Sequence, residues 1–158
     1  MEIPNQAVHL VEKPDLHETA KFYRELLAEA LIHIEEEFRA EGGSAYMVSG
    51  PIGSGATLQP NIDRIKNTIA RLRQNGIPVL DQTRWHNSNF TDMNLVHSNE
   101  LKLEEFYKPL IRSGRIKGLY MLPGWEQSSG ATVEHAEATR LNLPIKYLEA
   151  SDLTDPEY

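Results

Sequence analysis

Hydrophobic residues recur every three or four positions in two long stretches of the chain, and this spacing predicts two amphipathic helices. The apolar positions are Phe22, Leu26, Leu27, Ala30, Leu31, Ile34 and Phe38 in the first stretch and Ile62, Ile65, Ile69 and Leu72 in the second. Capping and breaking residues place these helices over about 15–40 and 60–75. Two shorter helices are expected over 98–111, bent or broken near Pro109, and over 129–141.

Four short apolar runs predict strands that alternate with the helices. These runs cover residues 45–49, 77–80, 116–122 and 144–148. Alternation of strand and helix at this spacing is typical of βαβ units, whose strands form a parallel sheet. We therefore expect an α/β protein with a three-layer, Rossmann-like or flavodoxin-like fold. Its mainly parallel sheet should have about four to five strands flanked by helices, with an extra helix at the N-terminus.

The length of 158 residues is that of one ordinary domain. Within it we expect an N-terminal arm and helix over 1–43, an α/β core over 44–150 and an exposed acidic tail over 151–158. Residues 81–97 are polar and are expected to form a long loop. Loops of this length in a compact domain are usually functional or mobile, so this loop is a candidate part of a binding site.

Composition and charge exclude several classes of function. The formal net charge of −7 leaves no basic surface for DNA or RNA, so no nucleic-acid polymer is expected as a partner. No cysteine is present, which excludes disulfides and thiolate catalysis. The six histidines show no metal-binding spacing with glutamate, so no metal is expected. No apolar run approaches the roughly 20 residues of a membrane span, and no secretory signal is visible, so we expect a cytoplasmic protein without membrane partners.

Two loops between an apolar run and a helix contain candidate functional residues. After the first strand come Gly50, Pro51, Ile52 and Gly53, where glycines let the backbone approach a ligand closely. A plain turn explains this loop about as well, because it is neither a Walker A loop nor a G-x-G-x-x-G motif. These four residues are therefore candidates for binding the substrate or its phosphate.

The second loop follows the strand predicted over 116–122. Ser128, Ser129 and Gly130 precede a helix, and Glu134 lies six residues after Ser128. In open α/β sheets ligands bind at the carboxyl ends of the strands, and N–H groups at a helix start can hold a phosphate. A simpler interpretation is that Ser129 caps the helix while Glu134 interacts with the helix dipole.

Together the two loops resemble the nucleoside 2-deoxyribosyltransferase superfamily, including its nucleotide N-hydrolase branch and a group of small uncharacterised relatives. The matching segments are Tyr46-Met47-Val48-Ser49-Gly50-Pro51, Leu122-Pro123-Gly124-Trp125, Ser128-Ser129-Gly130-Ala131-Thr132-Val133-Glu134 and Ala136. The resemblance covers roughly residues 45–148 and leaves the N-terminal helix outside.

The resemblance implies a reaction at the anomeric carbon of a nucleotide sugar. It implies that Glu134 is the nucleophile at C1′ and that Ser128 contacts the 5′ end of the sugar. Family members that act on nucleoside 5′-monophosphates have serine at this position, whereas those that act on free nucleosides tend to have aspartate. A hydroxyl group beside helix N–H groups accommodates a phosphate that a carboxylate would repel. The resemblance also implies a reaction without metal or cofactor.

Other positions receive roles through the resemblance alone. It implies a tyrosine that orients the nucleophile, here Tyr46, although core packing explains that residue equally well. It also implies a second carboxylate on the helix before the third strand, where Glu104 and Glu105 are candidates besides Glu100. No residue there matches the family's acid unambiguously, and a solvated helix face also explains the two adjacent glutamates.

The long polar loop begins with Arg84, Trp85 and His86, which the resemblance places beside the base pocket. Trp85 is expected either to stack on a nucleobase or to cap the hydrophobic core. Arg84 or His86 is expected to contact the base edge or a phosphate; alternatively, His86 is exposed to solvent.

We therefore expect an enzyme that cleaves or transfers the N-glycosidic bond of a nucleoside 5′-monophosphate or nucleoside. One alternative is a module that senses or sequesters a nucleotide without catalysis. Another is a lysine-decarboxylase-like phosphoribohydrolase, whose P-G-G-x-G-T-x-x-E motif is similar to the segment from Pro123 to Glu134. A homodimer or higher homo-oligomer is expected, because the superfamily commonly completes its pocket with residues of a neighbour.

Overall fold

A parallel sheet of three strands forms the centre of the fold. The computed structural model describes residues 16–52, 55–85 and 98–153. The strands are β1 (Ala45–Ser49), β2 (Ile116–Met121) and β3 (Ile145–Tyr147), in the spatial order β1-β2-β3. Their carboxyl ends lie at one edge of the sheet, with Ser49 beside Met121 and Met121 beside Tyr147. The α/β class and the parallel sheet expected from the sequence are confirmed.

Among the described residues, the sheet has fewer strands than the sequence predicted. The run over 77–80 forms only an isolated parallel bridge between Tyr46 and Val79. Pro78 has no N–H to donate, and the chain turns into a 3₁₀ helix, η3 (Gln82–Trp85), shortly after the bridge. The described residues therefore form three strands, where four to five were predicted.

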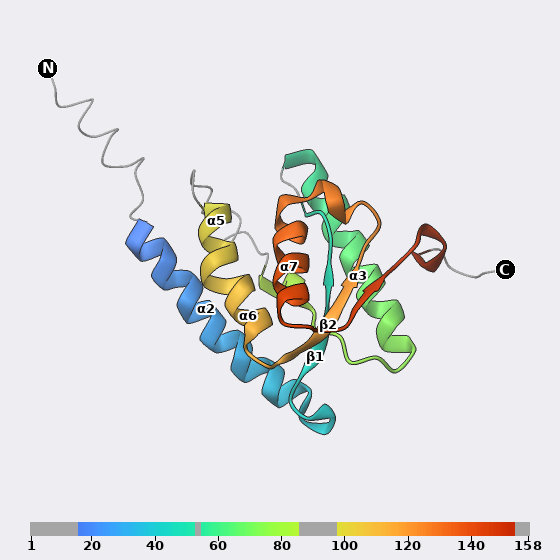
Figure 1. Cartoon of the computed structure of the whole chain (residues 1–158), viewed down its shortest axis with the longest axis horizontal. Coiled ribbons are helices and arrows are strands. Elements are labelled where there is room, and N and C mark those ends of the chain that lie inside the picture. The colour runs from blue at the N-terminus through green and yellow to red at the C-terminus, as the bar shows by residue number, and fades with distance from the viewer. Residues whose placement is uncertain (1–15, 53–54, 86–97, 154–158) are drawn as a thin grey trace, which may run out of the picture.

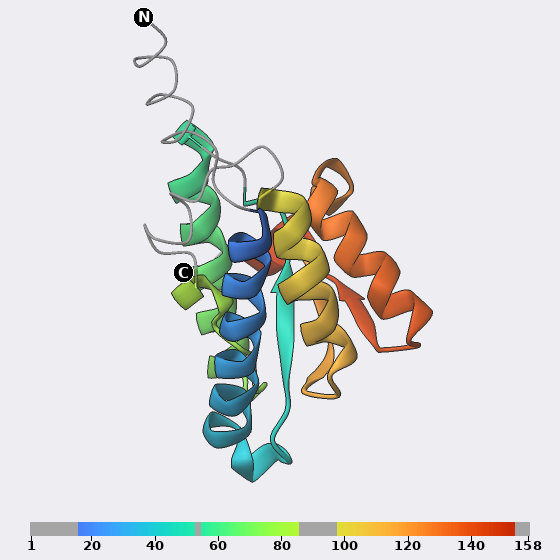
Figure 2. The same ribbon diagram turned by 90° about the vertical axis from the view of Figure 1, so that its left-hand side faces the viewer.

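Helices cover both faces of the sheet. They are α2 (Leu16–Glu37), α3 (Leu58–Gln74), α5 (Ser98–Lys102), α6 (Lys108–Arg112) and α7 (Ser129–Arg140), with short 3₁₀ turns η1 (Arg39–Glu41), η2 (Gly55–Thr57), η5 (Trp125–Gln127) and η6 (Ala150–Leu153). Figure 2 shows α3 (green) and α7 (orange) on opposite sides of β1. In Figure 1, α2 (blue) lies alongside α5 and α6, against which it packs.

The alternation of side chains along β1 divides the core into two parts. Met47 joins the cluster formed with α2, α6 and α7, whereas Val48 joins the cluster formed with α3. Successive side chains of a strand point to opposite faces, so Ser49 points to the same face as Met47. This alternation brings the hydroxyl group of Ser49 to α7, where the candidate site lies.

The N-terminal helix α2 packs on the rest of the fold through the predicted stripe. Two residues of this stripe, Ala30 and Ile34, are fully buried, and so is Tyr23 next to it. The helix ends at Glu37, somewhat before the predicted end, because the chain tightens into η1 and then reaches Gly42 with a φ of 83°. The sequence therefore predicted the helix and its buried face, and missed the last tightened turn.

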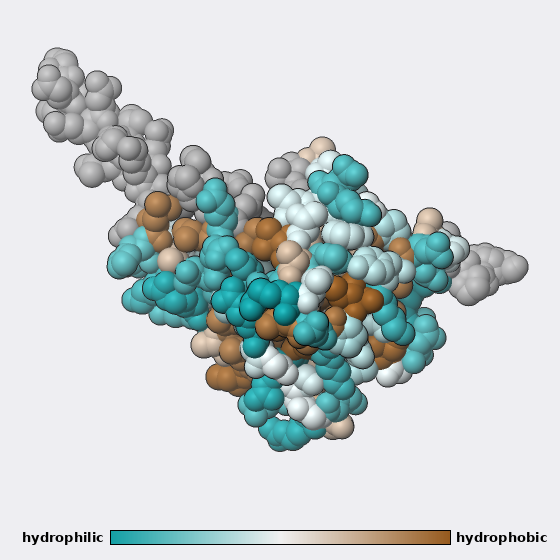
Figure 3. Space-filling model, in the orientation of Figure 1, coloured by the Kyte–Doolittle hydropathy of each residue, from teal (hydrophilic) through white to brown (hydrophobic). Residues whose placement is uncertain are grey.

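Large hydrophobic side chains remain exposed at three described positions. Leu16 and Ile32 of α2 are 47% and 58% exposed, and Tyr147 of β3 is 56% exposed. Figure 3 shows brown apolar patches interspersed with teal hydrophilic residues on one face of the molecule. The homo-oligomer expected from the sequence would cover surface of this kind, and it stays a prediction.

The helix predicted over 98–111 changes its winding in the middle. Between α5 and α6 lies a π-helical segment, η4 (Leu103–Tyr107). Pro109 falls in the first turn of α6, where its missing N–H is tolerated. The predicted break is thus a widened turn just before Pro109, and π turns of this kind are frequent at functional sites.

A buried carboxylate ties α6 to α7. Glu137 accepts hydrogen bonds from Arg112 (2.7 Å) and Arg140 (2.5 Å). These hydrogen bonds, from Arg140 first and then Arg112, hold the pKa of the Glu137 carboxyl at about 2, below its ordinary value of 4.5. The lowered pKa means that the ionised carboxylate stabilises the folded chain above pH 4.5, and that this stabilisation is lost as the pH falls towards 2.

Glu137→Gln is expected to lower the free energy of unfolding at pH 7, because the variant loses both ion pairs. The loss should be only about 1–2 kcal/mol, because both arginines are solvent-exposed and water screens their charges. The difference between variant and wild type should shrink between pH 4.5 and pH 2. Urea denaturation at several pH values measures it, with Glu104→Gln as a control for an exposed carboxylate. A difference that stays constant over this range would contradict the assigned ion pairs.

Candidate functional site

A pocket of about 370 Å³ opens at the carboxyl ends of β1 and β2, a volume within the usual range for small-molecule sites. Its wall is built mainly from the end of β1 and the loop after it, the start of α7 and the α5–η4 segment, with single residues from α3, η3 and η5. The lining residues are Val48, Ser49, Gly50, Pro51, Ile52, Ile65, Gln82, Lys102, Leu103, Tyr107, Gln127, Ser128, Ser129, Gly130, Ala131 and Glu134. Both loops singled out in the sequence therefore meet at one pocket.

The loop after β1 forms one side of this pocket. Gly50, Pro51 and Ile52 all line it, as predicted, whereas Gly53 lies outside the described residues. A Cβ atom at Gly50 would lie 2.7 Å from Cδ1 of Leu122. Only glycine therefore allows the ends of β1 and β2 to approach this closely.

The start of α7 forms the second side. Ser128 is the N-cap, and its Oγ accepts a hydrogen bond from the backbone N–H of Ala131 (3.2 Å). The cap is thus Ser128 and not Ser129, because the chain is still extended at Ser128 and becomes helical from Ser129. Ser128, Ser129 and Gly130 all line the pocket, so the N-terminal end of α7 faces the space where a ligand would bind.

Glu134 lies in the pocket wall with only 9% of its surface exposed. The Oγ of Ser49 donates a hydrogen bond of 2.5 Å to its Oε1. Burial raises the pKa of the Glu134 carboxyl to about 7, although the Ser49 hydrogen bond and the charge of Lys102 oppose this rise. A carboxyl group that titrates near neutrality in a pocket is typical of functional sites.

The α5–η4 segment brings two residues to Glu134 that the sequence analysis did not select, Lys102 and Tyr107. Burial lowers the pKa of the Lys102 ammonium to about 8, and the charge of Glu134 opposes this change. Burial and the Glu134 charge raise the pKa of the Tyr107 phenol well above its ordinary value. The charge of Glu134 therefore affects the pKa of both side chains.

Gln82 of η3 contributes a further residue that the sequence analysis missed. Its side chain is 3% exposed, and its Nε2 donates a hydrogen bond of 2.6 Å to the carbonyl oxygen of Val48. Its Oε1 has no hydrogen-bond partner in the part of the chain that the structure describes. A buried acceptor without a partner is costly, so a ligand with an N–H or O–H group could satisfy it.

The two predicted acids lie outside the pocket. Glu104 is exposed and accepts a hydrogen bond from Lys108 (2.9 Å), while Glu105 pairs with Arg24 of α2 (2.9 Å). Both belong to η4, whose other side presents Leu103 and Tyr107 to the pocket. The structure therefore gives these glutamates helix-surface roles.

Tyr46 also lies away from Glu134. It is the second residue of β1 and packs edge-to-face on Tyr120, with 5.4 Å between the ring centroids. Both tyrosines belong to the core cluster beneath α3, on the opposite face of the sheet from α7. The tyrosine that shares the pocket with Glu134 is Tyr107.

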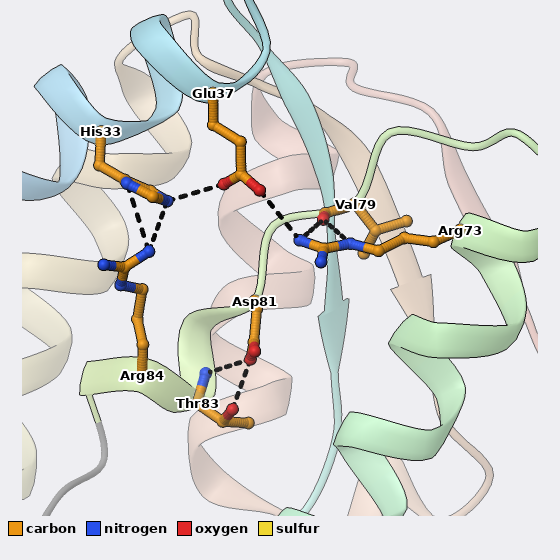
Figure 4. A network of polar contacts seen from close by, with 7 residues as sticks. All are labelled: His33, Glu37, Arg73, Val79, Asp81, Thr83 and Arg84. Carbon is orange, nitrogen blue, oxygen red and sulfur yellow. Dashed lines mark hydrogen bonds and ion pairs between the residues drawn. The ribbon is translucent and has the colours of Figure 1, made fainter.

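Two of the three residues predicted for the base pocket, Arg84 and Trp85, do not line this pocket. Trp85 is 7% exposed and stacks edge-to-face on Phe106 within the core. Arg84 extends towards α2, where its guanidinium lies 2.7 Å from Nε2 of His33 (Figure 4). His33 in turn pairs with Glu37 (2.7 Å) in the same network. His86 lies outside the described residues.

The sequence contained only weak signals for the missed residues. Ser49 belongs to the matched segment that begins at Tyr46, and it could have been singled out as the last strand residue. Lys102 and Tyr107 are five positions apart, a spacing that an ordinary α-helix does not bring to one face. The π turn changes that spacing, and nothing in a single sequence predicts where such a turn forms.

Two general properties bear on the site. None of the described helices has the length and apolar character that crossing a membrane requires. Among residues 16–52, 55–85 and 98–153, no three histidine, aspartate or glutamate side chains lie together in a way that would hold a metal ion.

The fold and site define an α/β domain whose ligand pocket lies at the carboxyl ends of a parallel sheet. The chain belongs to a family described as "Domain of unknown function (DUF4406)", whose model matches residues 45–147, more than half of the chain. The match begins with β1 and ends with β3, so it includes every pocket residue and leaves α2 outside. No curated protein and no solved structure matches the chain.

Proposed function

We propose that this chain cleaves the N-glycosidic bond of a nucleoside 5′-monophosphate, or transfers its sugar to a second base, with Glu134 as nucleophile. The observation that carries the proposal is the buried carboxylate of Glu134, which accepts a hydrogen bond from Ser49 in a pocket that also contains the start of α7. The resemblance of both loops to the nucleoside 2-deoxyribosyltransferase superfamily supports the same assignment.

The start of α7 favours a ligand with a phosphate group. Backbone N–H groups and the positive end of the helix dipole attract anions, and Ser128 and Ser129 add hydroxyl groups. From Ser128 to Glu134 the helix rises about 9 Å, at about 1.5 Å per residue. A sugar phosphate is of comparable length, so a phosphate at Ser128 would leave C1′ near Glu134.

The proposed chemistry needs an ionised carboxylate. Glu134 attacks C1′ as the bond from C1′ to the base nitrogen breaks, which gives a covalent glycosyl ester. Water then releases the sugar phosphate, or a second base accepts the sugar. Because the pKa of Glu134 is about 7, the reactive form predominates at mildly alkaline pH.

A nucleotide-binding module without catalysis is the second candidate. It is favoured by one observation: neither Glu104 nor Glu105 lines the pocket, so the acid implied by the resemblance is not at either position. The enzyme is favoured by Lys102 and Tyr107, which place two other proton-bearing groups near Glu134. A titratable carboxylate in the pocket is also an unfavourable choice for a site that only binds anions.

The direct test is incubation with the nucleosides, the deoxynucleosides and their 5′-monophosphates, followed by chromatography of released bases. Release from monophosphates is the expected result. Release from ribonucleotides alone would favour the phosphoribohydrolase. Binding of a monophosphate in calorimetry without any release would establish the binding module and refute the enzyme.

Ser128→Asp tests the phosphate assignment. The carboxylate would still cap α7 but would repel a phosphate, so KM for monophosphates should rise at least about tenfold while free nucleosides change little. Ser128→Asn is the matched control, since it caps the helix without charge. Steady-state kinetics on both substrate classes measure the effect, and an equal loss on both would refute the phosphate contact.

A further inference from the structure

The α5–η4 segment presents its two faces to different surroundings. Lys102 is the last residue of α5, and with Leu103 and Tyr107 it lines the pocket. Glu104 and Glu105 of the same segment pair with Lys108 and Arg24 outside the pocket. The face of this segment that lines the pocket with Glu134 thus contains the ammonium group of Lys102 and the phenol of Tyr107, and no carboxylate.

Lys102 and Glu134 belong to different walls of one pocket. Lys102 comes from α5, and Glu134 comes from α7, which packs against η4. Each charge favours the ionised form of the other group. The titratable side chains among the described lining residues are Lys102, Tyr107 and Glu134, so these three determine the protonation of the site.

The proton affinities of these three groups indicate which one can donate a proton and which one can act as nucleophile. The ammonium of Lys102 has a pKa of about 8, so it holds a proton at neutral pH and gives it up readily. The phenol of Tyr107 has a pKa raised by burial and by Glu134, which makes it a weaker proton donor. Glu134 must be ionised to act as nucleophile and so cannot also supply the proton.

We propose that Lys102 is the general acid of the reaction, and that its ammonium group donates a proton to the nitrogen of the departing base. This inference rests on the proposed function and names the group that accompanies Glu134. The proposal is supported by geometry: Lys102 and Glu134 line the same pocket from different helices, whereas Glu104 and Glu105 form ion pairs outside it.

The Glu134 carboxylate forms a bond to C1′, and the electron pair of the C1′–N bond passes to the base nitrogen, which takes the proton from Lys102. The resulting neutral amine of Lys102 then accepts a proton from water as the water oxygen attacks C1′. Glu134 leaves as a carboxylate, and both side chains return to their starting charge.

Substrates with different leaving groups test this proposal. Lys102→Met should lower kcat on the best nucleoside 5′-monophosphate by about 10²–10³-fold, because the base leaves poorly without a proton. On a 4-nitrophenyl deoxyribofuranoside 5′-phosphate, whose leaving group departs as a stable anion, kcat should fall less than about tenfold. Lys102→Arg should show the same contrast, since guanidinium keeps the charge but does not release a proton at these pH values.

The control is Lys108→Met, which removes a lysine of the neighbouring helix that lies outside the pocket and should leave both rates within about twofold. The wild-type pH profile is a second measurement that needs no variant to fold. The rate with the nucleotide should fall above about pH 8, and the rate with the nitrophenyl compound should not.

The outcomes separate the two proposals. If the wild type cleaves the nucleotide and Lys102→Met lowers both rates equally, or neither, Lys102 is not the acid while the proposed function stands. A rate with the nucleotide that does not fall above about pH 8 would lead to the same conclusion. If the wild type cleaves neither substrate, the proposed function fails and the role of Lys102 fails with it.

Discussion

Glu134→Gln is expected to stabilise the protein by about 3 kcal/mol at pH 8 while abolishing base release. In the unfolded chain this carboxyl group has a pKa near 4.5, and burial raises it to about 7 in the folded chain. A raised carboxyl pKa means that the folded state binds a proton more tightly than the unfolded state. Stability contributed by this group therefore falls as the pH rises from 4.5 to 7 and stays low above pH 7.

The neutral amide of glutamine avoids that cost and can still accept the hydrogen bond from Ser49. Urea denaturation should show the gain at pH 8 and almost none at pH 4, where the wild-type carboxyl group is already protonated. Chromatography should show base release reduced at least about 10³-fold, because an amide is not a nucleophile at C1′. The exposed Glu126 provides the matched control, and Glu126→Gln should change neither quantity.

A variant that releases base at the wild-type rate would refute the role of Glu134 as nucleophile. Equal stability of variant and wild type at pH 8 would contradict the burial of the ionised group. Stabilisation together with lost activity is the pattern expected when a functional group is held in an unfavourable environment.

Gly118→Ala is expected to lower the free energy of unfolding by about 3 kcal/mol, because the backbone just before β3 lies too close to Gly118 of β2 to admit a side chain. A Cβ atom at this position would lie 2.4 Å from the carbonyl oxygen of Pro144 and 3.1 Å from Cε1 of Tyr46. The same Pro144 oxygen accepts the backbone hydrogen bond from Leu119 (3.0 Å), so moving it away weakens the pairing of β3.

Gly130→Ala is the matched control for stability. Nothing lies within 4 Å of the Cβ atom it would add, and alanine is a better helix former than glycine. Thermal unfolding should therefore show a large loss for Gly118→Ala and no loss for Gly130→Ala. Wild-type stability of Gly118→Ala would contradict the observed register of β2 and β3.

Periodicity predicted most of the fold because each element repeats a local physical rule. The stripe that includes Ile65 and Ile69 is buried in α3, and the apolar run over 45–49 is β1. The run over 77–80 has the same apolar character but forms one bridge, since pairing depends on what lies beside it. Apolar character predicts burial, whereas strand pairing is decided by neighbours distant in sequence.

The same distinction applies to the candidate site. Gly50 was selected from the sequence because it follows a strand, and Ser128 and Glu134 because they lie at the start and in the first turns of a helix that follows a strand. Such positions meet at one edge of a parallel sheet. Tyr46 was assigned near the nucleophile, but the alternation of β1 points it to the opposite face from Ser49. To predict that a residue lines the pocket, one must therefore know both its position along the strand and the face of the sheet to which its side chain points.

By itself, the sequence determined the α/β class, the parallel sheet and the meeting of two loops around Glu134, because these follow from local patterns and their order along the chain. Only the tertiary structure decided which groups face Glu134. The widened turn over 103–107 brings Lys102 and Tyr107 to the pocket and leaves Glu104 and Glu105 outside. Proton affinity likewise depends on burial and neighbouring charge, which a single sequence does not contain.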